Sequence, residues 1–467
     1  MAIKQIKVDV NEVTIGMFVS GLDRPWSQTP FPLQGFYIRD LEEIKQLKTH
    51  CNHVYIDVQK GRGPVATKLK TLSEKFGEKP KIFSRTAKGA TAKVEVAPLR
   101  IKRDVYTEKE PLKKEVKRAK QLHQRVHRAV GEIIKQLDHG GGTIPVVETK
   151  RLASEMVDSI LRNPDAFSWL SRVQDVDEYT YSHAVRSAVW AIVFGRHAGL
   201  PKKDLDTLAM GVLLKDVGKT KLEKELLTKK NRSGAEEGEY EKFIDLGVQI
   251  LREMPGIEPR VISVVKTHRE RINGSGYPQH LRGDKIPLLG KVAGIVTFYD
   301  ETTNPRGEKF PLSPSKAVAK LYELRNIDFQ EELVVEFIRA IGLYPTGTLV
   351  ELSTGEVGVV VEQNFERRLK PKIMLVLDAV KNPLKQPILL DLAEDEKRKQ
   401  NLVDSGKFTV AEVEKIEIAQ DLEPGSYDID VAAIRDNYLF AGTEDYKEPK
   451  KKGRGLLSML GFNRDWD

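Results

Sequence analysis

Two short stretches of the chain carry the residue types that could do metal or phosphate chemistry. Residues 267–278 read Thr-His-Arg-Glu-Arg-Ile-Asn-Gly-Ser-Gly-Tyr-Pro, and residues 215–219 read Lys-Asp-Val-Gly-Lys. Imidazole and carboxylate groups offer lone pairs to a metal, whereas ammonium and guanidinium groups pair with anions. The first stretch follows an apolar helical run, and its glycines and proline require a sharp turn. Chemistry is therefore expected where a helix ends and a loop begins.

Together with His183, these stretches resemble the HD-GYP family, bacterial metal-dependent phosphodiesterases that hydrolyse cyclic di-GMP. The Asp-x-Gly-Lys element at 216–219 and the run Arg-Ile-Asn-Gly-Ser-Gly-Tyr-Pro at 271–278 occur in the family's order, and the resemblance spans residues 154–341. It implies an all-α domain for signal transduction. It also implies a site where two or three transition metals activate a water and neutralise the phosphodiester.

Several positions that would hold metal in the family carry other residues here. The replaced positions are Lys215, Phe243, Arg269 and Thr297. The metal ligands that remain, by the resemblance, are His183, Asp216 and His268. Three such groups could hold one divalent transition metal (Mn, Fe or Zn) with an open position, but not the two-metal clamp. The cofactor prediction is therefore one metal ion at most, in a degenerate active site.

The replacements also add positive charge, which predicts a metal-independent anion pocket. This pocket would bind cyclic di-GMP without cutting it efficiently, using Lys215, Lys219, Arg269, Arg271, Gly276, Tyr277 and Pro278. Lys219 is the single candidate catalytic residue, for the alternative of a weakly active one-metal phosphodiesterase, a hydrolase. A simpler alternative is that Lys215 and Arg269 pair with Asp216 and Glu270 and fill an abandoned cavity. The Gly-Tyr-Pro loop is also a candidate contact surface for a protein partner.

The 467 residues are too many for one ordinary core and predict a multidomain chain. Apolar alternation and turn residues predict strands near both ends, and helical periodicity predicts an all-α middle, with helices over 204–218 and 236–254 among others. The first sixty or so residues also resemble the domain of unknown function that often precedes HD-GYP domains. The predicted parts are a small α+β N-terminal domain (1–60), a flexible basic linker (61–113), a basic amphipathic helix (114–145), an HD-GYP-like helical domain (146–345), a small β-rich appendage (346–440) and a disordered basic tail (441–467).

The formal net charge of +8 makes anionic partners plausible. The helix predicted over 114–137 carries an apolar stripe among basic residues, so it could bind a membrane surface or nucleic acid. The alternatives are that it packs on a neighbouring element or forms a homodimer with a second copy. A polyanion or membrane-surface adaptor is therefore a further functional alternative.

The chain has a single cysteine, Cys51, which allows no intrachain disulfide and fits a reducing compartment. No window approaches the length of a membrane span, and the first residues contain no apolar signal core. A cytoplasmic location is therefore expected.

Overall fold

The computed structural model describes residues 5–11, 13, 18–24, 29, 31, 36–38, 41–57, 96, 99, 101, 105–106, 110–139, 142–172, 179–229, 231–306, 311–364, 367, 369–405 and 415–440. The predicted linker lies largely outside these residues, and the predicted basic tail lies wholly outside them. The described residues form two units, one of residues 1–80 and 342–422 and one of residues 81–341 and 423–467.

The N-terminal part of the first unit is a small antiparallel sheet with one helix. Its strands are β1 (Gln5–Asp9), β2 (Phe18–Leu22), β3 (Phe36–Tyr37) and β4 (His53–Asp57), in the order β1-β4-β2-β3. The helix α1 (Leu41–His50) precedes β4. Apolar residues from the strands and from α1 form a common core that includes Val19, Leu47 and Val54. The predicted α+β class is confirmed.

The C-terminal part of the same unit is a second antiparallel sheet. Its strands are β5 (Leu349–Leu352), β6 (Val357–Glu362), β7 (Lys372–Leu377), β8 (Pro383–Asp391) and β9 (Ile418–Asp421), in the order β8-β7-β6-β5-β9. The helix α15 (Leu392–Asp404) follows β8 directly, and Asp391 caps it by accepting hydrogen bonds from two backbone N–H groups. The segment predicted as β-rich is therefore strand-rich, but it also contains helices.

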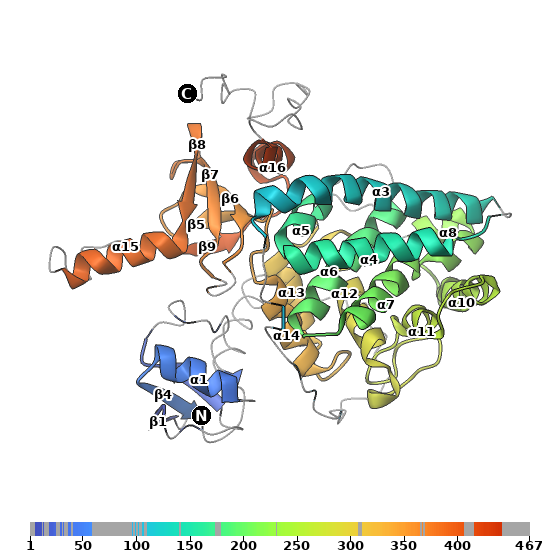
Figure 1. Ribbon diagram of the computed structural model, residues 1–467, viewed down its shortest axis with the longest axis horizontal. Coiled ribbons are helices and arrows are strands. Elements are labelled where there is room, and N and C mark those ends of the chain that lie inside the picture. Colours follow the sequence, from blue (N-terminus) through green and yellow to red (C-terminus); the bar gives the residue numbers. More distant parts are fainter. Residues whose placement is uncertain are drawn as a thin grey trace. The chain divides into compact units, whose positions relative to one another are not determined.

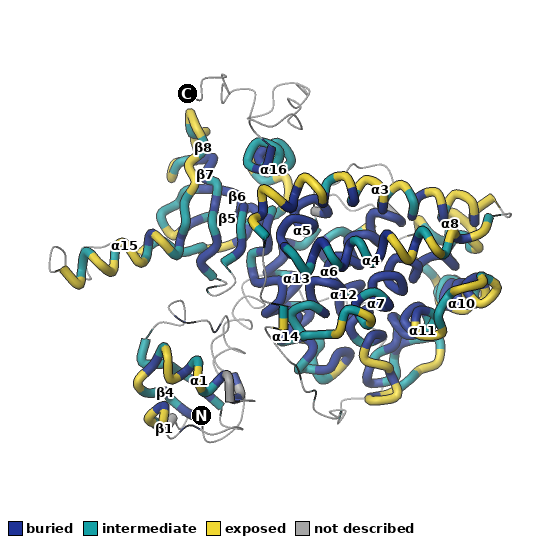
Figure 2. Tube along the Cα trace, in the orientation of Figure 1, coloured by how far each residue is buried: buried dark blue, intermediate teal, exposed yellow. Residues whose placement is uncertain are grey.

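The second unit is helical, as predicted (Figure 1). Buried positions fill its interior along α6, α7 and α12, while the outer side of α3 is exposed (Figure 2). Its α-helices are α3 (Leu112–Asp138), α4 (Val146–Arg162), α5 (Pro164–Arg172), α6 (Tyr179–His197), α7 (Lys202–Leu214), α8 (Lys224–Thr228), α9 (Gly234–Glu241), α10 (Phe243–Glu253), α11 (Pro259–Thr267), α12 (Leu288–Thr303), α13 (Pro314–Glu323), α14 (Glu331–Ile341) and α16 (Val431–Phe440).

The basic amphipathic helix is α3, and its apolar stripe packs on α4, α5 and α6 of the same unit. The buried Glu115 on this helix accepts hydrogen bonds from Ser159 and Arg162 of α4. The apolar face of α3 is thus covered within the chain, as the packing alternative predicts. A membrane contact or a homodimer through α3 would have to use its exposed charged face.

Two predicted helices differ from the structure close to the candidate site. The helix predicted over 204–218 ends at Leu214, and a 3-10 turn, η2 (Val217–Lys221), follows. In this turn the backbone at Gly218 approaches α10 closely, because a Cβ atom on Gly218 would lie 1.9 Å from the carbonyl oxygen of Phe243. The helix predicted over 236–254 is two helices, α9 and α10, which meet at Lys242.

Among the residues that the structure describes, no helix combines the length and the apolar character needed to cross a bilayer.

Candidate functional site

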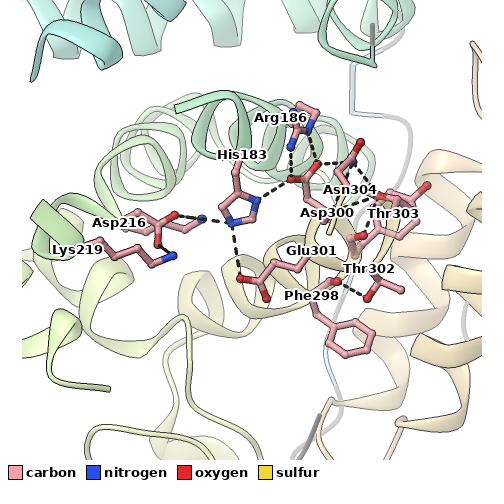
Figure 3. A network of polar contacts seen from close by, with 12 residues as sticks. His183, Arg186, Asp216, Lys219, Phe298, Asp300, Glu301, Thr302, Thr303 and Asn304 are labelled. Carbon is pink, nitrogen blue, oxygen red and sulfur yellow. Dashed lines mark hydrogen bonds and ion pairs between the residues drawn. The ribbon is translucent and has the colours of Figure 1, made fainter. Parts of the chain in front are cut away.

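The candidate site lies in the interior of the helical unit, where α6, η2, α12 and the end of α11 meet (Figure 3). His183 comes from α6, and Asp300 and Glu301 come from α12. Lys215 and Asp216 form the short connection between α7 and η2. Groups that are more than one hundred residues apart in the chain therefore meet in one cluster.

Two lysines neutralise Asp216. The Lys215 ammonium donates a hydrogen bond to Oδ2 of Asp216, and the Lys219 ammonium lies 2.7 Å from Oδ1. Burial lowers the pKa of Lys215 to about 8, although Asp216 opposes this effect. Burial by itself would raise the pKa of Asp216, but the two ammonium groups hold that pKa well below its usual range. At neutral pH this is therefore one carboxylate between two cations.

His183 is oriented by an aspartate and an arginine that are also fully enclosed. Its Nδ1 lies 2.7 Å from Oδ2 of Asp300, and Arg186 donates two hydrogen bonds to the same carboxylate, at 2.9 and 3.2 Å. Burial lowers the pKa of His183, and the nearby Lys215 lowers it further. His183 is therefore neutral, with Nδ1 donating to Asp300 and Nε2 directed toward Asp216, 3.7 Å from its Oδ2 (Figure 3).

His268 is the second buried imidazole of the cluster and caps the C-terminal end of α11. Its Nδ1 lies 2.8 Å from the carbonyl oxygen of Val265, so Nδ1 carries the proton. Its Nε2 is buried and has no hydrogen-bond partner among the described residues. Burial, Arg269 and Lys215 together hold the pKa of His268 well below its usual range.

Glu301 is a site residue that the sequence analysis missed. Arg269 binds it with a two-pronged contact, in which Nη1 donates to Oε2 at 2.9 Å and Nη2 donates to Oε1. Oε1 also lies 3.8 Å from Nε2 of His183. The predicted pairing of Arg269 with Glu270 is wrong, whereas the predicted pairing of Lys215 with Asp216 is confirmed. The available signal was a second acidic residue directly after Asp300 in a helix that contains no other acidic residue.

Glu270 instead fixes the Gly-Tyr-Pro loop. Its carboxylate accepts hydrogen bonds from the backbone N–H groups of Gln279 and Leu281, at 2.8 and 2.9 Å. A Cβ atom on Gly276 would lie 2.4 Å from the carbonyl oxygen of Arg269, so only glycine fits there. Tyr277 and Pro278 follow, joined by a cis peptide bond.

Arg271 and Tyr277 contact aromatic rings and backbone next to the charge cluster. The Arg271 guanidinium lies 4.8 Å from the centre of the Phe329 ring and donates to the carbonyl oxygen of Glu270 at 2.8 Å. The ring of Tyr277 packs edge-on against Phe243, with the ring centres 6.4 Å apart. These contacts stabilise the loop beside the site, and the predicted roles in phosphate binding stay a prediction.

The structure brings the three predicted metal ligands close together but not in an arrangement that fits a metal ion. No group of three or more His, Cys, Asp or Glu side chains in the described ranges could hold one. Both Asp216 oxygens face lysine ammonium groups, which offer no lone pair. The Lys215 ammonium donates to Oδ2 of Asp216, the same oxygen that lies 3.7 Å from Nε2 of His183. A protein cation therefore lies among the donors that a metal would need.

Three family models match the chain. Residues 171–330 match the HD domain, residues 5–143 match DUF3391, a domain of unknown function, and residues 349–398 match a KOW domain associated with the HD domain. The HD-domain match contains the whole charge cluster and the Gly-Tyr-Pro loop at 276–278. The chain therefore contains an HD domain, preceded by a DUF3391 domain. The DUF3391 match extends past the first sixty residues and includes α3, which packs on helices of the HD domain.

Several relatives of this chain carry names of cyclic dinucleotide phosphodiesterases. The cyclic di-GMP phosphodiesterase PA4108 of Pseudomonas aeruginosa is 27% identical over 387 residues, which are 82% of this chain and 88% of that protein. The 3'3'-cGAMP-specific phosphodiesterase 2 of Vibrio cholerae is 29% identical over 160 residues, or 33% of this chain and 30% of that protein. A solved structure, Bd1817, an HDG"Y"P protein from Bdellovibrio bacteriovorus, is 16% identical with a TM-score of 0.41, covering 72% of this chain and 98% of that one.

Proposed function

We propose that this chain is a cyclic di-GMP signalling protein whose HD-GYP domain binds the dinucleotide without hydrolysing it efficiently. The names of the relatives support the ligand, because PA4108 matches most of the chain and is named as a cyclic di-GMP phosphodiesterase. The observation that supports the loss of hydrolysis is the Lys215 ammonium, which pairs with the same Asp216 oxygen that His183 faces. A cation fixed by the protein neutralises phosphate charge, but it cannot activate a water as a metal does.

The charge balance of the cluster supports anion binding. With both histidines neutral, the cations are Arg186, Lys215, Lys219 and Arg269, and the carboxylates are Asp216, Asp300 and Glu301. One positive charge is left over in a poorly hydrated interior, where charges attract anions strongly. Lys219 and Arg269 have side chains that are each 10% exposed, so they are the cations nearest to solvent.

Calorimetric titration of cyclic di-GMP into chelator-treated protein tests this proposal. We expect binding without added metal and no linear product in a parallel turnover assay. Lys219→Gln and Arg269→Gln should each weaken binding, because each removes a cation at the solvent side of the cluster. Lys242→Gln is the matched control, since Lys242 forms an exposed ion pair with Glu239 in the same unit. Binding and hydrolysis that arise only with manganese would contradict the proposal.

A weakly active one-metal phosphodiesterase is a second candidate, and one observation favours it. Nε2 of His268 is a buried lone pair without a hydrogen-bond partner among the described residues, which suits a metal ligand. For this function Lys215 would have to leave Asp216. Turnover that depends on manganese and is lost in His268→Gln would establish it.

The adaptor alternative rests on the exposed basic face of α3 rather than on the site. It predicts salt-sensitive binding to unrelated polyanions that is unaffected by Arg269→Gln.

A further inference from the structure

Glu301 occupies a place where an arginine binds a carboxylate and two lysines attract it electrostatically. Its two oxygens accept from the two terminal nitrogens of Arg269, and Nε2 of His183 lies 3.8 Å from Oε1. Lys219 and Lys215 both interact with the same carboxylate electrostatically. In Figure 3 the Glu301 side chain extends from α12 toward His183.

Glu301 is also the carboxylate of the cluster that meets solvent. Its side chain is 32% exposed, whereas those of Asp216 and Asp300 are 2% and 0% exposed. An anion that arrives from solvent therefore meets Glu301 and Arg269 first. Displacing Asp216 would leave two buried lysine ammonium groups without a counter-ion. Glu301, in contrast, can rotate into solvent and remain hydrated and charged.

A carboxylate and a phosphodiester present similar groups to an arginine. Each carries one negative charge over two oxygens, and the planar guanidinium binds either with two parallel hydrogen bonds. The two-pronged contact between Arg269 and Glu301 is therefore the contact that a phosphodiester would make.

We propose that Glu301 is an intramolecular competitor of the ligand. Its carboxylate occupies the binding position, or seat, of one phosphodiester of the cyclic dinucleotide. The ligand binds when Glu301 turns away from Arg269, and the strength of that contact sets the affinity. This inference rests on the proposed function, because it assigns the ligand's phosphodiester to the same cluster.

Calorimetric titration of cyclic di-GMP and, separately, of inorganic phosphate into metal-free full-length protein tests the inference. Glu301→Gln removes the competing charge but keeps the shape, and we expect it to bind cyclic di-GMP about tenfold more tightly than the unchanged protein. Glu239→Gln is the matched control, because it removes one negative charge from an exposed ion pair of the same unit. The control should leave the affinity unchanged.

Two further variants keep the test informative if the first one folds poorly. Glu301→Asp retains the charge but shortens the side chain, so it should bind with an affinity between those of the unchanged protein and Glu301→Gln. Adding Arg269→Gln to Glu301→Gln should abolish the gain, because the seat itself is lost.

The outcomes separate this inference from the proposed function. Equal or weaker binding in Glu301→Gln, beside normal binding by the unchanged protein, would overturn the inference and leave the function standing. Phosphate binding gained by Glu301→Gln alone, with no cyclic di-GMP binding by any variant, would support the seat and contradict the function. If neither ligand binds any variant, both are wrong.

Discussion

Asp216 is the residue on which the charges of the site depend. It is enclosed, and both of its oxygens face ammonium groups of neighbouring lysines. The pKa of Lys215, about 8, means that this lysine is mostly charged at neutral pH. Loss of the carboxylate would leave two cations facing each other without water to screen them.

We therefore expect Asp216→Asn to lower the free energy of unfolding of the helical unit by about 3 kcal/mol or more, the usual cost of breaking a buried ion pair. Urea unfolding followed by helical circular dichroism measures this change. Glu239→Gln breaks an exposed pair instead, and should cost less than about 1 kcal/mol. Similar costs for the two variants would mean that the buried pairs are not formed in solution.

Metal removal gives a second prediction for the same residues. Because the lysines already satisfy Asp216, treatment with chelator should leave the unfolding temperature of the protein unchanged. Differential scanning calorimetry before and after treatment is the measurement. A drop on chelation that manganese reverses would show that Asp216 binds metal rather than Lys215.

At the scale of elements, the position of η2 against α10 holds Lys215, Asp216 and Lys219 in place. Gly218 allows this approach, because a Cβ atom there would lie 1.9 Å from the Phe243 carbonyl oxygen and 2.4 Å from the Gly247 nitrogen. Both of these atoms belong to the backbone, so a side chain at 218 would push the two elements apart.

Gly218→Ala should therefore lower the free energy of unfolding by at least about 2 kcal/mol, in the range for overpacking a tight interior, and should weaken cyclic di-GMP binding. Gly238→Ala is the control, because nothing lies within 4 Å of a Cβ atom at that helical position. The control should gain up to about 1 kcal/mol from helix propensity. Urea unfolding and calorimetric titration of both variants decide the matter.

The contact between α3 and α16 predicts a pH dependence. Burial, with further electrostatic effects of His127 on the same helix and of Arg435 on α16, lowers the pKa of His123 on α3 to about 3. The folded chain thus keeps His123 neutral, whereas the unfolded chain protonates it below a pH of about 6.5. The stability that this residue contributes is therefore complete above that pH and is lost as the pH falls toward 3.

When the pH is lowered from 7 to 5, the unchanged protein should lose about 2 kcal/mol more free energy of unfolding than His123→Gln loses. Urea unfolding at the two pH values measures it. His139→Gln, at the exposed C-terminal end of the same helix, is the control and should show a smaller change. An equal response of the two variants would count against a buried His123.

At the scale of the whole molecule, the chain consists of a helical unit that contains the site and a unit that contains both sheets. A ligand stabilises the part of the protein to which it binds, by about 2.7 kcal/mol when its concentration is one hundred times the dissociation constant.

Hydrogen exchange with and without cyclic di-GMP should consequently show added protection in α6, α7 and α12 and little change in β5 to β8. Added protection confined to the sheets would place the ligand elsewhere, and protection along α3 alone would favour the adaptor alternative.

The sequence by itself determined the resemblance to HD-GYP proteins and the classes of the parts, and it predicted the loss of metal ligands. These properties are local: the motif at 271–278, the alternation in the strands, the apolar stripe of α3 and the replacement of a histidine by Lys215 can all be read without knowing any distant contact. Helix ends near the site were less predictable: the helix expected to reach residue 218 ends at Leu214, and Gly218 lies against the backbone of α10, which is distant in the chain.

Only the tertiary structure decided which charges meet. His183 and Asp300 are 117 residues apart in the chain, and Arg269 and Glu301 are 32 residues apart. Spacing within a helix determines which side chains share a face, but not which face of another helix lies opposite. For that reason the sequence paired Arg269 with the adjacent Glu270, whereas packing of α12 against the end of α11 gave it Glu301 and left Glu270 to hold the loop.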